Sequence, residues 1–395
     1  MANSPGLSTN SSKADSHCID QSQAVRDRYA AAARVREAAL CCPVDYEARY
    51  LAAIPSEVIE RDYGCGDPSR YVREGDTVLD LGSGGGKIAF IASQVVGPKG
   101  RVIGVDVNEE MLALARRSKA AVAAQLGFSN VEFCRGHIQD LALDLDALDR
   151  WLAANPVKDS RSLEGLEAEQ ARLRCEAPMV ESDSVDNVVS NCVLNLVRED
   201  QKQRLISEIF RVLARGGRIA ISDIVADEPV PSSLKQDPEL WSGCISGAFH
   251  ELELLRRLEA AGFHGIAYDK WEQEPFAVVD GIEFRSVTVT AHKGKQGPCR
   301  EANQALVYAG PWKRVEDDDG HVFERGVRHA VCAKTFDIMT QAPYAGETIG
   351  IEPEQAIPEP QQEAFDCSRS EPRSPRESKG PEYRATRLPS EGGCC

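Results

Sequence analysis

An acidic residue and a run of glycines mark the first place in this chain that could do chemistry. Residues 78–87 read as a strand that ends in a turn and opens a helix. Asp80 lies inside the strand end, and the turn carries glycines at alternate positions, Gly82, Gly84 and Gly86. Glycine lets the backbone pass close to a ligand. A dinucleotide site would place a pyrophosphate near this helix start, whereas the charge of Asp80 favours a cationic ligand such as S-adenosylmethionine.

Residues at the ends of the following strands complete this predicted cofactor site. Asp106 ends the next expected strand, where an acid can accept both ribose hydroxyls, although a dehydrogenase would share that acid. His137 and Ile138 end the third strand and could flank an adenine, and His137 alone could equally be a solvated loop residue. The predicted cofactor-binding residues are Asp80, Gly82, Ser83, Gly84, Gly86, Asp106, Val107, His137, Ile138 and Asn191.

Three cysteines form a second candidate group. Cys65 lies between two glycines, Cys192 ends an expected strand, and Cys244 lies in a glycine-rich stretch. In an open α/β sheet the reactive crevice lies beyond the carboxyl ends of the strands, where Cys192 falls. The other two lie on loops that could close over the same mouth. Each cysteine alone could also be an ordinary core residue, since free cysteine is often buried.

The elements that must position these residues follow a β–α rhythm that begins at Thr77. We expect strands at 77–82, 101–107, 131–138, 185–192, 217–225 and 283–293, and helices at 87–97, 109–126 and 199–214. Short apolar strands that alternate with helices predict a mostly parallel sheet covered on both faces. The predicted fold class is therefore α/β, a Rossmann-like, doubly wound, seven-stranded sheet. The alternation within 283–293 suggests a less buried edge strand.

Changes in composition divide the chain into segments. We predict a disordered start, a catalytic domain with a first helix at 21–40 and a helical insertion, a small α+β appendage, and a flexible tail that ends in Cys394 and Cys395. The corresponding ranges are 1–20, 21–294 with the insertion at 141–182, 295–349 and 350–395. Within the appendage we expect short strands at 308–316 and 328–337.

Overall composition excludes several classes of protein. A net charge of −16 argues against a nucleic-acid partner, which favours a basic face. No apolar run is long enough for a membrane span or a secretory signal, so we expect no membrane association and a cytoplasmic location. The 13 cysteines then indicate thiol chemistry rather than a disulfide framework. Their spacing does not match a structural zinc site, and no metal cofactor is predicted.

The contexts of these residues resemble those of the arsenite methyltransferases, a family within the class I methyltransferases that use S-adenosylmethionine. The similar segments run from about residue 22 to 294: YGCG at 63–66, VLDLGSGGG at 78–86, GRVIGVDV at 100–107, SNCVLNL at 190–196, FRVLARGGRIAISDIVAD at 210–227 and CISGAF at 244–249. The SNC and CISGA segments are specific to that family, whereas the glycine-rich motif is shared by the wider class.

The resemblance implies a class I methyltransferase fold and methyl transfer from S-adenosylmethionine to trivalent arsenic held by cysteine thiolates. Cys192 and Cys244 would be the core arsenic thiols. Cys65 would be a third ligand that also joins a redox relay with an upstream cysteine, Cys41 or Cys42. The implied substrates are arsenite and methylarsenite, and the implied partner is a thiol reductant such as thioredoxin or glutathione. We expect a monomer.

Some positions depart from the family pattern and leave alternatives open. Gly243 stands where the family often has an acidic residue, and Leu194 replaces a cysteine found in some members. The acceptor could instead be another thiophilic metalloid or an organic thiol. A non-catalytic, thiol-based metalloid-binding protein and an ordinary carbon or nitrogen methyltransferase are the other readings.

Overall fold

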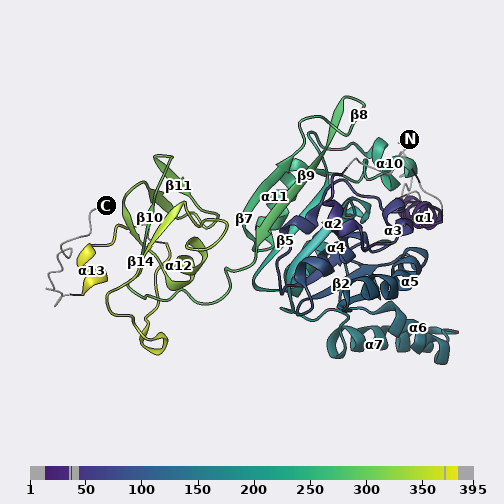
Figure 1. The fold of residues 1–395 in the computed structure, drawn as a ribbon, viewed down its shortest axis with the longest axis horizontal. Coiled ribbons are helices and arrows are strands. Elements are labelled where there is room, and N and C mark those ends of the chain that lie inside the picture. Colours follow the sequence, from purple (N-terminus) through teal and green to yellow (C-terminus); the bar gives the residue numbers. More distant parts are fainter. Residues whose placement is uncertain (1–13, 35–36, 38–43, 369–370, 381–395) are drawn as a thin grey trace, which may run out of the picture. The chain divides into compact units, whose positions relative to one another are not determined.

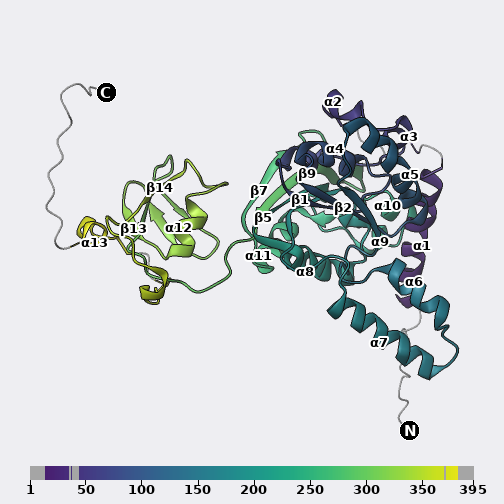
Figure 2. The ribbon, with the colours of Figure 1, turned by 60° about the horizontal axis from the view of Figure 1, so that its bottom comes forward.

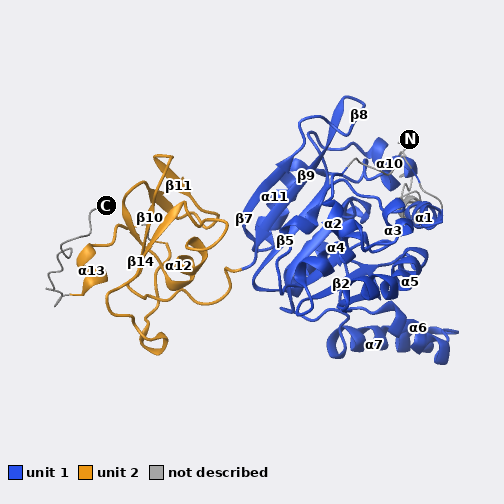
Figure 3. Ribbon diagram, in the orientation of Figure 1, with its two compact units in different colours: residues 1–293 blue, residues 294–395 orange. Residues whose placement is uncertain are grey.

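The computed structural model describes residues 14–34, 37, 44–368 and 371–380. The chain divides into two compact units, residues 1–293 and 294–395, which Figure 3 distinguishes by colour. Cys41, Cys42, Cys394 and Cys395, which the sequence analysis singled out, lie outside the described residues. None of the described helices is both long and apolar enough to cross a bilayer.

One large sheet organises the first unit. The described residues place nine strands in it, and seven of them follow the order β3-β2-β1-β4-β5-β9-β7. Their bounds are β1 Thr77–Leu81, β2 Arg101–Asp106, β3 Val131–Arg135, β4 Val185–Asn191, β5 Leu213–Ala226, β7 His264–Trp271 and β9 Ile282–His292. The first five of this order pair in parallel, and β9 runs antiparallel to both neighbours. This arrangement confirms the predicted doubly wound, mostly parallel sheet.

Two short strands extend the sheet, and one predicted strand position is wrong. β6 (Phe249–His250) pairs with β5, and β8 (Ala277–Val279) pairs with β9. The segment predicted as an edge strand, β9, lies between β5 and β7. Its apolar side chains Val287, Val289 and Ala291 are fully buried, so the alternation reflects a covered central strand.

Helices cover both faces of the sheet, and each face has its own hydrophobic core. α8 and α11 pack on one face through leucines and isoleucines such as Ile206 and Leu254, whereas α4 and α5 pack on the other through residues such as Phe90 and Leu114. Figure 2 shows these two pairs of helices on opposite sides of the strands. The bounds are α4 Lys87–Val96, α5 Glu109–Leu126, α8 Lys202–Val212 and α11 Glu251–Ala260.

Several short helices and one longer helix complete the described part of the first unit. α1 begins earlier than predicted, so the expected disorder of residues 1–20 does not hold for 14–20, which start this helix. Figure 1 shows α1, α3 and α10 near one another at one side of the unit. The bounds are α1 Ala14–Ala32, α2 Ala48–Leu51, α3 Ser56–Glu60, η2 Pro68–Tyr71, η3 Leu194–Leu196, η4 Glu199–Gln201, α9 Ser232–Lys235 and α10 Pro238–Ser242.

The stretch predicted as a helical insertion contains α6 (Leu145–Ala154) and α7 (Ser160–Glu176), which extend away from the sheet in Figure 2. Each begins at an aspartate, Asp144 or Asp159, whose side chain accepts a hydrogen bond from a backbone N–H of the first turn. Leu143, Leu148 and Leu173 form a small separate core beneath the two helices.

The second unit is folded well beyond the end predicted for it. β10 (Ala305–Tyr308) pairs with β13 (Arg328–Ala330) and β14 (Thr348–Ile351), while β11 (Arg314–Glu316) pairs with β12 (Val322–Glu324). The predicted strand at 328–337 is only partly correct, since α12 occupies Ala333–Met339. The predicted strand at 308–316 is likewise two strands, β10 and β11.

The predicted flexibility from residue 350 is wrong for the described residues up to 380. β14, the turn η5 (Glu359–Gln361) and the helix α13 (Pro375–Lys379) lie in this segment. Its anchor is Arg373, whose side chain is 3% exposed and whose guanidinium donates to both carboxylate oxygens of Glu301, at 2.8 and 2.7 Å. Both hydrogen bonds come from the nitrogen Nη2, and this ion pair fixes the segment against the start of the unit.

Candidate active site

A cavity of about 530 Å³ opens at the carboxyl ends of β1, β2 and β4. This is the place where open α/β sheets bind ligands, and the size is typical of a small-molecule site. All the predicted cofactor-binding residues except Gly86 line it. The other lining residues include Tyr29, Asp62, Tyr63, Gly85, Asn108, Met111, Gln139, Cys192 and Val193.

Asp80 is a buried carboxylate with an unused oxygen. It is 2% exposed, and its Oδ2 has no hydrogen-bond partner among the described residues. Burial raises its pKa well above the ordinary value, and the nearby charges of Asp62 and Asp106 raise it further. A buried carboxylate without a partner is unfavourable, so a ligand that brings a positive charge or a donor would be stabilised here. The residues present therefore fit the amino and sulfonium groups of S-adenosylmethionine.

Backbone donors hold Asp106 at the end of β2. Its two carboxylate oxygens accept hydrogen bonds from the N–H groups of Gly84 and Asn108, each at 2.8 Å. Burial raises the pKa of Asp106, while these backbone hydrogen bonds lower it. The glycine-rich turn and the acid are thus locked to one another, as a ribose-binding acid requires.

Two further predicted residues differ in their roles. Gly86 begins α4 with a φ of 93°, and a Cβ there would lie 2.8 Å from the Phe133 ring, so its role is to let the helix pack. His137 lines the cavity with Ile138, and burial lowers its pKa, so the ring is held neutral at pH 7.

The three predicted thiols meet next to this cavity. Cys65 and Cys192 form a disulfide with Cα atoms 5.9 Å apart, and the Cys244 thiol donates a hydrogen bond to the Cys192 carbonyl at 3.2 Å. All three are buried in one hydrophobic cluster. Cys192 also lines the cavity, so the thiol group and the predicted cofactor site share a wall.

The disulfide joins two of the thiols that the family resemblance implies as arsenic ligands. For Cys65 the resemblance also implies a redox relay with Cys41 or Cys42, and both of these lie outside the described residues. The partner of Cys65 in the structure is Cys192, because the loop that carries Cys65 folds onto the end of β4 at a separation suited to a disulfide.

Two of these cysteines have an unfavourable backbone conformation. Cys192 has a φ of 57° and Cys244 a φ of 63°, in the left-handed region that residues with a Cβ rarely adopt. Such strain concentrates at functional sites, where the surroundings must impose it. A cysteine that merely fills a core has no need of this conformation, and the geometry therefore supports a functional role for both.

Asn191 holds the loop that carries Cys65. Its Oδ1 accepts hydrogen bonds from the N–H groups of Cys65 (3.0 Å) and Gly66 (3.1 Å), and its Nδ2 donates to the Gly66 carbonyl at 2.8 Å. A Cβ on Gly64 would lie 2.1 Å from Asn191 Nδ2, and one on Gly66 would lie 2.4 Å from Ser222 Oγ. Both glycines of the YGCG segment are therefore needed for this close approach. Asn191 lines the cavity, but its hydrogen bonds hold the loop that carries the Cys65 thiol.

Sequence reasoning missed two side chains of the site. Asp223, near the end of β5, accepts a hydrogen bond from Leu194 N–H at 2.9 Å and so orders the turn after Cys192. Burial raises the pKa of Asp223 to about 7. Tyr29 on α1 places its hydroxyl 3.8 Å from Cys244 Sγ. The aspartate in the ISDIVAD segment was a visible signal, whereas nothing in the sequence places α1 beside Cys244.

Comparisons with known proteins identify the class of enzyme to which this chain is similar. Residues 73–262 match the family model of a methyltransferase domain, and residues 295–383 match a domain of unknown function (DUF8838). An arsenite methyltransferase of Aquipseudomonas alcaligenes is 30% identical over 75% of this chain and 78% of its own length. The arsenite methyltransferase of Mus musculus is 29% identical over 79% of this chain and 76% of its own.

A solved structure is similar as well. The crystal structure of an arsenic(III) S-adenosylmethionine methyltransferase from Chlamydomonas reinhardtii is 28% identical and superimposes with a TM-score of 0.53. The similarity covers 82% of this chain and all of that one.

Substituting Asp80 tests the predicted cofactor site. Asp80→Asn removes the negative charge while keeping the shape, and we expect S-adenosylmethionine to bind at least tenfold more weakly. The reason is that a hydrogen bond to a charged group contributes roughly 1.5–3 kcal/mol. Calorimetric titration measures the change. Asp186→Asn, at the opposite end of β4 where Asp186 accepts from Thr77 N–H at 2.8 Å, is the matched control and should bind normally. Equal affinity of Asp80→Asn and wild type would contradict the assignment.

Substituting Gly64 tests the role of the close contact with Asn191. In Gly64→Ala the new methyl group must displace the Asn191 amide, so we expect the free energy of unfolding of the reduced protein to fall by about 1–3 kcal/mol. Urea denaturation measures it. The control is Gly165→Ala in α7, where the nearest atom to a new Cβ is 3.9 Å away and helix propensity predicts a gain of up to about 1 kcal/mol. Similar effects at the two glycines would refute the contact as the cause.

Proposed function

We propose a three-thiolate substrate site at the carboxyl end of β4 in this chain, which belongs to the arsenite methyltransferase family. The protein transfers methyl groups from S-adenosylmethionine to trivalent arsenic. The observation that best supports the placement of the site is the convergence of Cys65, Cys192 and Cys244 beside the cavity that contains Asp80 and Asp106. Trivalent arsenic is soft and thiophilic, and three thiolates complete its pyramidal coordination.

Reduction precedes substrate binding in this proposal. The disulfide between Cys65 and Cys192 occupies two of the three sulfur atoms that the arsenic needs. Two equivalents of a reducing thiol open the disulfide by exchange, releasing the oxidised reductant and two cysteine thiols. Three thiols then condense with arsenous acid, forming three arsenic–sulfur bonds and releasing three waters. A reductant such as thioredoxin or glutathione is therefore a required partner.

The chain itself contributes by holding the thiols, and through them the arsenic, in position. S-adenosylmethionine would supply an electrophilic methyl group to the lone pair of the arsenic and leave as the thioether S-adenosylhomocysteine. Asn191 and the Ser286 hydroxyl, which donates to the Cys65 carbonyl at 2.8 Å, fix the loop of the third thiol. The strained backbone of Cys192 and Cys244 directs the other two. Holding both reactants in one geometry removes a large entropic barrier, which is where most of the rate enhancement would arise.

The same pair of cysteines can restore the arsenic after methyl transfer. Methylation oxidises arsenic from the trivalent to the pentavalent state. Two thiolates that join in a disulfide release two electrons, enough to return it to the trivalent state. The disulfide between Cys65 and Cys192 is the product expected of that step. Cys41 or Cys42 would then relay the oxidation outward to the reductant. We further propose that the chain acts as a monomer in the cytoplasm, where thiol reductants are abundant.

Serine substitutions test the division of labour among the thiols. Cys192→Ser and Cys244→Ser should each reduce all methylation by at least a hundredfold, because each leaves arsenic without a core thiolate. Cys65→Ser should lose methylation of arsenite but retain methylation of methylarsenite, which needs only two thiolates. Chromatography with arsenic detection measures the products, in the presence of excess thiol reductant.

Cys175→Ser is the control, since Cys175 is an exposed free cysteine on α7. It should methylate both substrates like the wild type. Equal losses at Cys65, Cys192 and Cys244 with both substrates would refute the division of labour. Failure of folded wild-type protein that binds S-adenosylmethionine to produce any methylated arsenic would refute the proposed site as a whole.

A further inference from the structure

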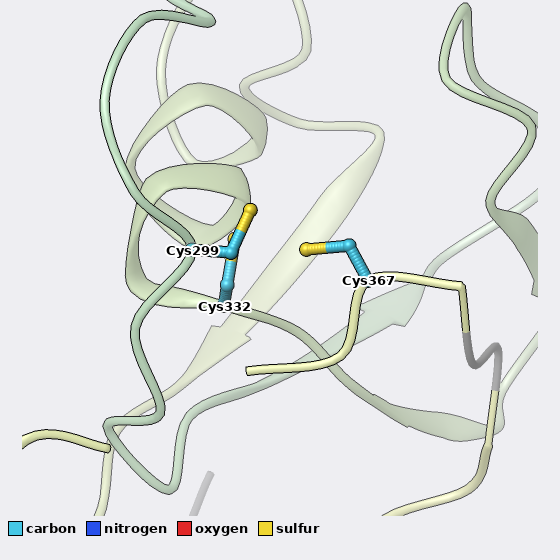
Figure 4. A group of neighbouring side chains, drawn as sticks. All are labelled: Cys299, Cys332 and Cys367. Carbon is cyan, nitrogen blue, oxygen red and sulfur yellow. The ribbon is translucent and has the colours of Figure 1, made fainter. Parts of the chain in front are cut away.

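A second group of three cysteines lies in the other unit of the chain. Cys299, Cys332 and Cys367 have sulfur atoms within 4.8 Å of one another. Figure 4 shows the Cys367 sulfur pointing toward the other two side chains. We propose that these three cysteines form a second binding site for trivalent arsenic, separate from the methyl-transfer site. The unit that carries them matches the domain of unknown function.

Backbone hydrogen bonds hold the three segments of this cluster together. The N–H of Phe365 donates to the Cys299 carbonyl at 3.0 Å, and the N–H of Ala333 donates to the Arg300 carbonyl at 2.9 Å. Arg300 and Ala364 also form a β-bridge. The cysteines come from positions far apart in the sequence, so the fold itself must bring them together. Their proximity is therefore a built feature of the unit.

The cluster has a buried floor and an accessible side. Cys332 is fully buried, whereas Cys299 and Cys367 are partly exposed. A small cavity adjoins it, lined in part by Cys332, Cys367, Phe323 and Phe365. An ion can therefore enter from the side of Cys299 and Cys367 and settle against Cys332.

The neighbouring groups shift the pKa values of Cys299 and Cys367 in opposite directions. Burial raises the pKa of Cys299, but hydrogen bonds from Cys367 and Cys332 together with the charge of Lys334 bring it below the ordinary value. The N–H of Thr335 donates to Cys332 Sγ at 3.4 Å, and its hydroxyl lies 3.2 Å from the same sulfur. Burial, followed by the neighbouring Cys299 and Cys332, raises the pKa of Cys367 well above the ordinary value, so a soft ion that binds the three sulfurs must displace this proton.

The number of sulfur ligands favours trivalent arsenic over a structural zinc ion. Within the described part of the chain, the group comprises three sulfur ligands and includes no histidine or carboxylate. A structural zinc ion takes four ligands in a tetrahedron. Trivalent arsenic takes three soft ligands, so three cysteines complete its coordination and leave its lone pair free. Binding condenses three thiols with arsenous acid, releases three waters and transfers no electrons. The proposal rests on the family's substrate but uses none of the methyl-transfer thiols.

Arsenic retention by the full chain tests this site in a background without the first one. The triple variant Cys65→Ser, Cys192→Ser, Cys244→Ser is reduced, freed of metals and given arsenite alone, and bound arsenic is counted by mass spectrometry after gel filtration. We expect about one arsenic per chain, with three sulfur neighbours in its X-ray absorption spectrum. Adding Cys299→Ser or Cys367→Ser, both at partly exposed positions, should lower the retained arsenic at least tenfold. Adding Cys175→Ser should not change it.

Two outcomes would overturn the proposal. The first is equal arsenic retention with and without Cys299→Ser and Cys367→Ser, which would place the arsenic on other cysteines. The second is seen when the metal-free background chain is given zinc instead: one zinc per chain, lost in both variants and not displaced by arsenite, would make the cluster a zinc site. Because the background lacks the methyl-transfer thiols, neither outcome bears on the function proposed for them.

Discussion

The hydrogen bonds between Asn191 and the Cys65 loop are the contact on which the substrate half of the site depends. One amide at the end of β4 satisfies two backbone N–H groups and one carbonyl of a loop that comes from before β1. These groups are buried, and leaving them unpaired would be unfavourable by about 1–3 kcal/mol each. The contact brings Cys65 to Cys192, and it explains why Gly64 admits no side chain, while Gly66 is restricted by Ser222.

The cofactor half and the thiol half meet at residues that belong to both. Asn191 and Cys192 line the cavity and also take part in the thiol cluster. Each half contains groups that are unfavourable in isolation: Asp80 has an unpaired buried oxygen, and Cys192 and Cys244 have left-handed backbones. Proteins concentrate such local conflicts at sites where a ligand or a reaction resolves them. Asp80 and Cys192, one from each half, line the same cavity.

Much of this organisation was predictable from the sequence, for physical reasons. Periodicity located the parallel strands, and the spacing of Asp80 and Asp106 located the cofactor cavity. The disulfide was not predictable, because sequence does not determine which cysteines pair. β9 was predicted as an edge strand because β7, the polar strand that lies beyond it in the sheet, has no clear apolar pattern. The cluster of Cys299, Cys332 and Cys367 was missed because its members lie far apart in the sequence. In addition, Cys367 lies in a segment whose polar, proline-rich composition suggested flexibility.

Anomalous diffraction at the arsenic absorption edge would locate the bound arsenic directly, in crystals of the reduced full chain grown with arsenite. We expect an arsenic peak at the carboxyl end of β4, from an arsenic atom bonded to the sulfurs of Cys65, Cys192 and Cys244, with the disulfide open. An intact disulfide together with no arsenic peak at this position, in crystals that contain bound arsenic elsewhere, would contradict this expectation.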